Sequence, residues 1–354
     1  MALQQQLDRI VAEEGVPGII AEVHTGDGAT WSGTAGVADF ETKQPRRREE
    51  HFRIGSVTKT FTSTITLQLA AEGQLSLDDS VEKWLPGLVR GRGNDGAAIT
   101  IRHLLAMTSG LYLYSMDPEL VAAETGAAFL EHRYDRYQPE DLIRVATSHP
   151  PAFSPGTRWR YNNTGYILAG MIVERITGRS FADELQRRIA RPLDLKDTYL
   201  PGDETTIREP HARTYTTALL TEPDNPVYDA TELHSSKAWT AGGMVSSLTD
   251  LNRFFSFLFG GTLLPPEQQQ ELLTMSSTEG AGWLPNTSYG LGIYTETLPS
   301  GAAVWGNGGA ITGTWTLSLG TKDGRHRLTA NLNGDWGNLL GVFTQLAETE
   351  FGPS

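Results

Sequence analysis

A serine followed three residues later by a lysine stands at the start of an apolar segment, in GSVTKTFTSTITLQLAAEG. Helical spacing places Ser56 and Lys59 on one face, one turn apart. A serine hydroxyl becomes a nucleophile when a base removes its proton, and a lysine amine can be that base when burial lowers its pKa. Free N–H groups at a helix start also favour an oxyanion. The pair is a candidate nucleophile and base.

The spacing alone is a weak signal, because an N-capping serine followed by a solvated lysine has the same pattern. Ser80 and Lys83 match it equally well. There, Asp78, Asp79 and Glu82 crowd the second lysine and would keep it charged. We therefore interpret Lys83 as a surface residue.

Two further segments carry residues suited to acyl transfer. In WRYNNTGYILAG, Tyr161 and Asn163 precede an apolar helical run. A tyrosine beside a lysine can act as acid or base toward a leaving group, and a carboxamide can bind a substrate amide. In WGNGGAITGTW, Gly306, Gly308 and Gly309 allow close approach of a ligand, and a strand N–H there could complete an oxyanion hole. Taken singly, these segments are also compatible with a capped helix and a loop.

In this order the three segments resemble the serine penicillin-recognising superfamily, in particular its class C β-lactamase and Streptomyces D-alanyl-D-alanine carboxypeptidase branch. The resemblance covers nearly the whole chain, through ITIRHLLAMTSGL, PLDLKDTYL, AGGMVSSLTDL and YGLGI. It implies that Ser56 is the acylated nucleophile, Lys59 its base partner and Tyr161 the acid or base for the leaving group. It also implies that Asn163 binds the substrate amide, and that the backbone N–H groups of Ser56 and Ala310 form the oxyanion hole.

The third motif departs from this family pattern. Its usual Lys or His is Asn307 here, followed by Gly308 and Gly309, and Tyr294 follows YGLGI where the carboxypeptidases have an arginine. No cation or hydroxyl then remains at these positions to hold a substrate carboxylate. We expect these four residues to contact the substrate, together with Trp239, which lies near the motifs. The departures favour an ester or a neutral amide over a free C-terminal acid.

Hydrophobic periodicity predicts an α/β architecture with one sheet built from both chain ends. Residues 1–73 and 236–354 are predicted to form this α/β lobe, and residues 74–235 a mainly helical lobe that becomes loop from 201 onward. Within the first lobe, 238–247 is predicted as a strand. The family resemblance implies an antiparallel sheet flanked by helices, with the active site between the two lobes.

Composition excludes several other classes of function. With 29 basic and 42 acidic residues, the 354-residue chain has a formal charge of −13, so we expect no nucleic-acid partner. There is no cysteine, the eight histidines occur singly, and His-Glu-x-x-His is absent. Acyl transfer through a serine needs no metal or cofactor, and we expect none. No segment approaches the roughly 20 apolar residues of a membrane span.

The start of the chain has neither the basic nor the apolar region of a signal peptide. We therefore expect a cytoplasmic protein, or a secreted one whose signal has been removed. The expected partner is a small-molecule or peptide substrate. A monomer and a homo-oligomer are equally compatible with the sequence.

The favoured function is hydrolysis of esters or of neutral amides and peptides through an acyl-enzyme on Ser56, with a D-configured residue on the acyl side. D,D-carboxypeptidase or β-lactamase activity is one alternative, and a transacylase or peptide cyclase of secondary metabolism is another. The competing class is a binding protein that kept the fold and lost turnover. Asn307 favours that last interpretation, and the intact Ser56, Lys59 and Tyr161 oppose it.

Overall fold

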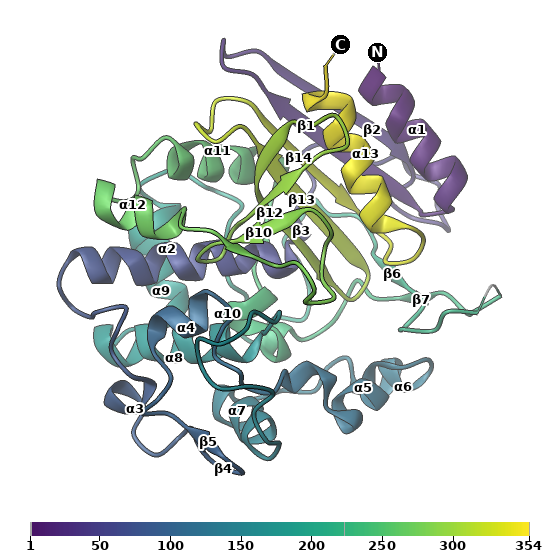
Figure 1. Ribbon diagram of the computed structural model, residues 1–354. Helices are drawn as coiled ribbons and strands as arrows, with labels where there is room; N and C mark the ends of the chain where they lie inside the picture. The colour runs from purple at the N-terminus through teal and green to yellow at the C-terminus, as the bar shows by residue number, and fades with distance from the viewer. Residues whose placement is uncertain (1, 223, 354) are drawn as a thin grey trace.

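The computed structural model describes residues 2–222 and 224–353 and contains one large antiparallel sheet (Figure 1). Its strand order is β2-β1-β14-β13-β12-β11-β10-β9. Strand β1 (Gly18–His24) pairs with β2 (Thr30–Gly36) on one side and with β14 (Arg327–Leu332) on the other. The remaining strands are β9 (Ser276–Ser277), β10 (Thr287–Tyr289), β11 (Tyr294–Thr297), β12 (Ala303–Ile311) and β13 (Thr314–Gly320). Both chain ends therefore build the sheet, as the periodicity predicts.

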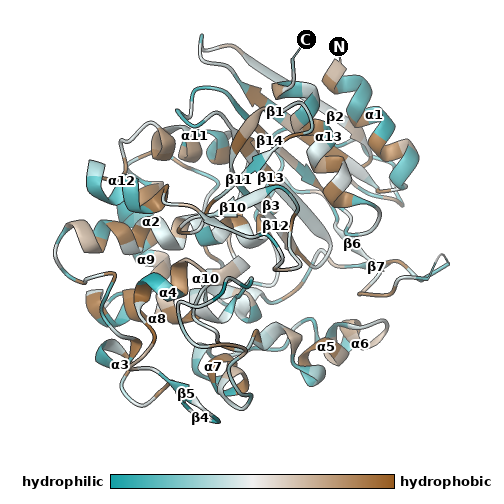
Figure 2. Ribbon diagram, in the orientation of Figure 1, coloured by the Kyte–Doolittle hydropathy of each residue, from teal (hydrophilic) through white to brown (hydrophobic). Residues whose placement is uncertain are grey.

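Different helices cover the two faces of this sheet. Helices α1 (Ala2–Glu14) and α13 (Leu339–Phe351) pack together, α1 against β1 and β2 and α13 against β13. Helix α11 (Leu248–Phe259) packs against β1 and β14. Because both faces are covered, β1 is buried along nearly its whole length. The apolar stripe of α1 faces inward, and Figure 2 shows hydrophobic and hydrophilic residues alternating along this helix.

Helix α2 (Thr58–Ala71) lies between the sheet and a group of helices drawn from the middle of the chain (Figure 1). Eleven of its fourteen residues are buried, because α8 (Thr164–Thr177), α10 (Trp239–Gly242) and α12 (Pro266–Leu272) surround it. The middle group consists of α3 (Val81–Trp84), α4 (Ile101–Leu105), α5 (Pro118–Glu124), α6 (Ala128–His132), α7 (Pro139–Thr147), α8 (Thr164–Thr177) and α9 (Phe181–Leu185). Residues 201–235 are mostly loop, with the short strands β6 (Tyr215–Thr216) and β7 (Tyr228–Asp229). The exact division into two lobes stays a prediction.

The strand predicted over residues 238–247 is wrong for its first half. A short helix, α10 (Trp239–Gly242), comes first, and only Val245–Ser246 form a strand, β8, which pairs with β3 (Phe52–Arg53). The Thr240 hydroxyl donates to the carbonyl of Tyr166 in α8, and Gly243 has helical backbone angles. Packing against a distant helix therefore decides the conformation here, which local alternation cannot report.

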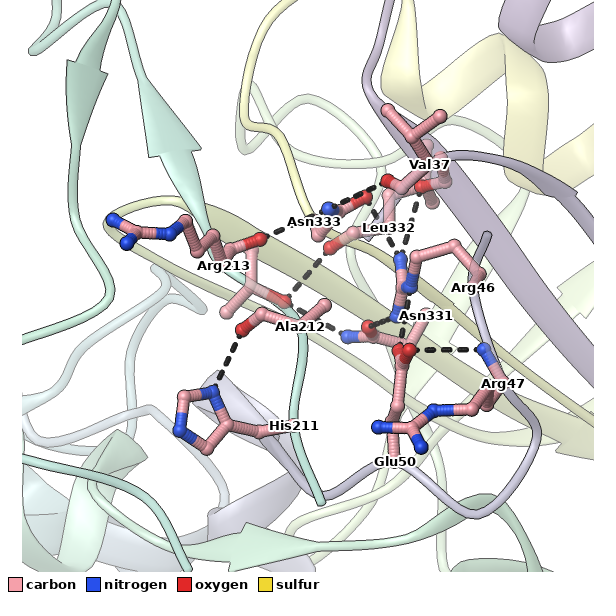
Figure 3. A network of polar contacts seen from close by, with 12 residues as sticks. Val37, Arg46, Arg47, Glu50, His211, Ala212, Arg213, Asn331, Leu332 and Asn333 are labelled. Carbon is pink, nitrogen blue, oxygen red and sulfur yellow. Dashed lines mark hydrogen bonds and ion pairs between the residues drawn. The ribbon is translucent and has the colours of Figure 1, made fainter. Parts of the chain in front are cut away.

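A buried polar network joins distant parts of the chain under the end of the sheet (Figure 3). The guanidinium of Arg46 pairs with Glu50 at 2.6 Å and donates to the side chains of Asn331 and Asn333. Asn333 in turn donates to the carbonyl of Arg213 at 2.9 Å. The network thereby fixes the segment that leads into β6. Within the described residues, no helix is both long and apolar enough to cross a membrane.

Candidate active site

The three residues implicated in acyl transfer meet at the start of α2. Ser56 lies in a 3₁₀ turn, Gly55–Val57, which continues directly into this helix, and Lys59 lies in its first turn. The Nζ atom of Lys59 is 2.8 Å from Ser56 Oγ and 2.7 Å from the hydroxyl of Tyr161. It also contacts the carbonyl oxygen of Ala241, in α10, at 2.7 Å. The structure therefore places one amine within hydrogen-bond distance of both hydroxyls.

Burial changes the ordinary charge state of Lys59. Its side chain is 1 % exposed, and desolvation lowers its pKa well below 10.5. No carboxylate pairs with it among the ion pairs of the described residues. A neutral amine has two hydrogens and a lone pair, so it can donate to Ala241 and Tyr161 while accepting from Ser56. Lys83, by contrast, is an exposed partner of Asp79, which confirms its interpretation as a surface residue.

The pKa of Tyr161 is shifted upward, whereas that of Lys59 is shifted downward, so Tyr161 keeps its proton. Its hydroxyl lies 2.5 Å from Ser56 Oγ, and burial raises its pKa to about 12 although the hydrogen bond with Ser56 lowers it. The phenol is therefore protonated near neutral pH, where it can act as an acid. Of the two groups beside Ser56, the amine is the one suited to accept a proton.

The backbone of β12 comes unusually close to the 3₁₀ turn of Ser56. A Cβ added at Gly309 would lie 2.1 Å from the carbonyl oxygen of Ile54 and 2.5 Å from the nitrogen of Ser56. A Cβ at Gly55 would lie 2.7 Å from the nitrogen of Ala310. Only glycine permits this approach. It places the backbone of Ser56 beside that of Ala310, the juxtaposition that an oxyanion hole requires.

Asn307 does not face the cavity, contrary to the expectation from the sequence. Its side chain is 3 % exposed, and its Nδ2 donates to Thr60 Oγ1 at 3.1 Å and to the carbonyl of Gly292 at 2.9 Å. Its Oδ1 accepts from the N–H of Gly308. A short amide with three polar neighbours inside the protein is satisfied there and turns inward. Asn307 therefore links β12 to α2.

The other expected substrate contacts in this region also belong to the scaffold. The hydroxyl of Tyr294 lies beside Gly308, and its buried ring packs edge-on against Trp283. The ring of Trp239 packs against Phe181, at the start of α9. Neither aromatic side chain lines the cavity described below. Packing against other aromatic rings therefore decides where these two side chains point, and their positions near the motifs in sequence do not predict it.

A cavity of about 340 Å³ opens beside Ser56. Asn163 lines it, as expected, and its Nδ2 donates to Ser115 Oγ at 3.2 Å; Ala310 lines the strand side. The residues that sequence reasoning missed include Tyr114, Ser115 and Glu124. The only signal for the first two was their position just after ITIRHLLAMTSGL. The other lining residues are Thr216, Ala218, Leu219, Leu233, His234, Lys237, Ala238, Ala241, Gly242, Ile311, Thr312, Trp315 and Asp335.

One ion pair lies on the cavity wall. Lys237 Nζ is 2.9 Å from Glu124 Oε1, and it also donates to the carbonyl of Leu120. The hydroxyl of Tyr114 donates to the carbonyl of Lys237 and holds this segment in place. Among the described residues that line the cavity, Lys237 is the single lysine or arginine. Its charge is already compensated.

The chain belongs to the beta-lactamase family, whose family model matches residues 3–323. It is similar over its whole length to a D-stereospecific amidohydrolase from Streptomyces sp., with 43% identity, a TM-score of 0.91, and coverage of 99% of this chain and 98% of that one. A D-amino acid amidase from Ochrobactrum anthropi SV3 is 28% identical with a TM-score of 0.84, covering 98% and 97% of the two chains.

A curated relative is the esterase EstB of Burkholderia gladioli, 33% identical over 202 residues, which are 55% of this chain and 50% of the esterase. The match thus spans about half the length of that relative. These findings confirm both the superfamily that the motif order indicates and the predicted α/β fold.

Proposed function

We propose that the protein is a serine hydrolase that cleaves neutral amides or esters through an acyl-enzyme on Ser56. The observation that carries this proposal is the contact of one buried amine, Lys59 Nζ, with Ser56 Oγ at 2.8 Å and with the Tyr161 hydroxyl at 2.7 Å. Because no carboxylate among the described residues compensates the amine, it is suited to work as a neutral base.

Acylation uses all three of these side chains. Lys59 takes the proton of Ser56 while Oγ bonds to the substrate carbonyl carbon, and the N–H groups of Ser56 and Ala310 stabilise the resulting oxyanion. Tyr161 then gives its proton to the departing nitrogen or oxygen as that bond breaks. The ammonium of Lys59 returns a proton to Tyr161. The products are the acyl-enzyme and a neutral amine or alcohol.

Deacylation repeats the sequence with water. The same pair of groups removes a proton from the water molecule as its oxygen attacks the acyl carbon. The proton returns to Ser56 Oγ when the ester bond breaks, which releases the acid and restores the enzyme. Every step in this scheme uses side chains that already touch one another.

The site suits a substrate with a neutral leaving group better than a peptide whose leaving residue carries a free carboxylate. An unpaired cation would hold the terminal carboxylate of a D,D-carboxypeptidase substrate most strongly, through charge-assisted hydrogen bonds. Asn307 faces inward, Tyr294 is buried, and Lys237 is paired with Glu124. The names of the Streptomyces and Ochrobactrum relatives support a D-amino acyl amide as the substrate class.

The non-catalytic alternative loses its main support. Asn307 favoured it, since this residue replaces the family's titratable group in the third motif. Its amide instead bonds within the scaffold, while the contacts among Ser56, Lys59 and Tyr161 are complete without it. We therefore favour catalysis over binding alone.

The direct test is a panel of substrates with D- and L-amino acid amides, p-nitrophenyl esters, a D-Ala-D-Ala peptide and a cephalosporin. We expect the D-amide and the esters to be hydrolysed, and a fluorophosphonate probe to label Ser56. The Ser56→Ala variant is the control. Activity or labelling that persists in it would refute the nucleophile assignment, and preference for the free-acid peptide would refute the substrate class.

A further inference from the structure

An aromatic cluster lies against the phenol ring of Tyr161. At its centre is Trp283, from the loop between β9 and β10. The rings of Trp283 and Tyr161 are nearly parallel, with 19° between their planes and 6.0 Å between their centroids. Trp159, Tyr289 and Tyr294 pack around the same indole at 5.0, 5.6 and 5.5 Å. The cluster therefore packs the partly buried indole of Trp283 against the partly buried ring of Tyr161.

The loop that carries Trp283 is held by its own hydrogen bonds. Thr278 Oγ1 donates to the carbonyl of Thr287, and Thr287 Oγ1 donates to the carbonyl of Leu284 at 2.7 Å. The backbone of Thr297, in β11, donates to the carbonyl of Asn286. These bonds tie both ends of the loop to the sheet. The indole is consequently presented by a braced loop.

The neighbours of the Tyr161 hydroxyl explain why the packing of Trp283 against the phenol ring matters. The hydroxyl of Tyr161 points to Ser56 and Lys59, and Lys59 Nζ lies 4.9 Å from the ring centroid. Burial keeps the Tyr161 pKa at about 12, so the phenol retains its proton. Trp283 packs against the ring of Tyr161 and supplies part of that burial.

We propose that Trp283 is a positioning residue for Tyr161, whose indole excludes water from the phenol ring and fixes its hydroxyl between Ser56 and Lys59. This inference rests on the proposed function, in which Tyr161 protonates the leaving group. It adds a determinant of which substrates are cleaved. A variant in which the Tyr161 hydroxyl is no longer held between Ser56 and Lys59 should still hydrolyse activated esters but should hydrolyse amides much more slowly.

The chemical reason lies in the leaving group. When the C–N bond of an amide breaks, the nitrogen must take a proton, which here comes from Tyr161 and is replaced from the ammonium of Lys59. A p-nitrophenolate leaves with the bonding electron pair and needs no proton. Both substrates form the same acyl-enzyme on Ser56. The ratio of their rates therefore reports the proton donor and is insensitive to the nucleophile.

The experiment compares Trp283→Ala with the parent enzyme on a carboxamide and a p-nitrophenyl ester of the same D-amino acyl group. We expect kcat/KM for the amide to fall on the order of 10²-fold relative to that for the ester, the scale of a lost general acid. The basic limb of the amide pH profile should move to lower pH, because a hydrated phenol has a pKa near its ordinary value of about 10. Trp283→Phe should restore both properties.

The matched control is Trp31→Ala, in β2, which removes a half-buried indole far from Tyr161 and should leave the ratio unchanged. If Trp283→Ala does not fold, Trp283→His keeps a planar ring with a polar edge and should shift the ratio in the same direction. An equal loss for both substrates, or no change in the ratio, would overturn the inference. Failure of the proposed function is distinct, since it would appear as ester hydrolysis by Ser56→Ala.

Discussion

At the scale of single residues, Lys59 is the group on which the proposed chemistry depends. A lysine at the protein surface is charged and cannot serve as a base near neutral pH. Here the side chain is 1 % exposed and has hydroxyl and carbonyl oxygens as its partners. Desolvation opposes its charge, so its pKa lies well below 10.5. The same burial that costs stability makes the amine available to Ser56.

Removal of this amine should abolish most of the activity. We expect Lys59→Ala to lower the rate of Ser56 acylation by about two orders of magnitude or more, the scale of lost general-base catalysis. The rate is measured by fluorophosphonate labelling or single-turnover kinetics. Lys83→Ala is the matched control, because Ser80 and Lys83 have the same spacing but Lys83 is exposed. An unchanged rate in Lys59→Ala would make the lysine structural.

The two pKa shifts also predict the pH profile of kcat/KM. Acylation requires a neutral Lys59, so the rate rises as pH increases through its lowered pKa and is already high well below pH 10.5. It requires a protonated Tyr161 with amides, so the rate falls as pH approaches about 12. We expect the basic limb to be absent for p-nitrophenyl esters. A profile that rises only near pH 10.5 would contradict the lowered pKa of Lys59.

At the scale of elements, β12 approaches the 3₁₀ turn and brings the backbones of Ser56 and Ala310 together, where we propose the oxyanion hole. Two glycines make this approach possible, and Asn307 holds it by bonding β12 to Thr60 in α2 and to the carbonyl of Gly292. The hydroxyl of Thr60 donates to the same carbonyl at 2.6 Å. In this protein the first residue of the third motif, Asn307, holds β12 in place through hydrogen bonds. A lysine or histidine at this position would instead have added a positive charge.

A methyl group at Gly309 should separate these two elements. Its Cβ would lie 2.1 Å from the carbonyl oxygen of Ile54, so β12 must move away from Ser56. We expect Gly309→Ala to lower kcat by about 10²–10³-fold, the cost of losing one oxyanion donor. Steady-state kinetics on an ester measures the loss. Gly202→Ala is the control, since its Cβ meets only a flexible carboxylate at 3.3 Å and should be neutral.

At the scale of the whole molecule, the buried network of Arg46 joins segments that are far apart in the chain (Figure 3). Arg46 and Glu50 are each about 1 % exposed, and they connect to Asn331 and Asn333 at the end of β14. Asn333 continues the connection to the carbonyl of Arg213, just before β6, and Thr216 of β6 lines the cavity. The network therefore couples the stability of the sheet to the shape of the cavity.

Loss of one partner in this network should be costly. We expect Glu50→Ala to lower the free energy of unfolding by about 3–5 kcal/mol, because it leaves the guanidinium of Arg46 buried without its counter-ion. Urea denaturation measures the change. The neighbouring Glu49→Ala removes an exposed pair with Arg48 and should cost at most about 1 kcal/mol. Similar losses in the two variants would argue against a structural role for the buried pair.

The sequence by itself determined what depends on local spacing. Helical periodicity placed Ser56 and Lys59 on one face, alternation identified the paired strands, and the order of the motifs identified the family, which its family model confirms. It also indicated that Tyr161 and Ala310 lie at the site, where the structure places them. Helical and strand periodicity is local information, because it acts within a few residues, whereas the places of Tyr161 and Ala310 came from the family resemblance.

Only the tertiary structure decided where individual side chains point and which distant partners they meet. Asn307 turns inward to Thr60, Trp239 packs on Phe181, and the first half of 238–247 becomes helical against α8. Trp283, 122 residues from Tyr161, covers its ring from a loop whose own sequence carries no motif. These contacts depend on packing between segments that local periodicity does not relate, so the fold had to be known before they could be assigned.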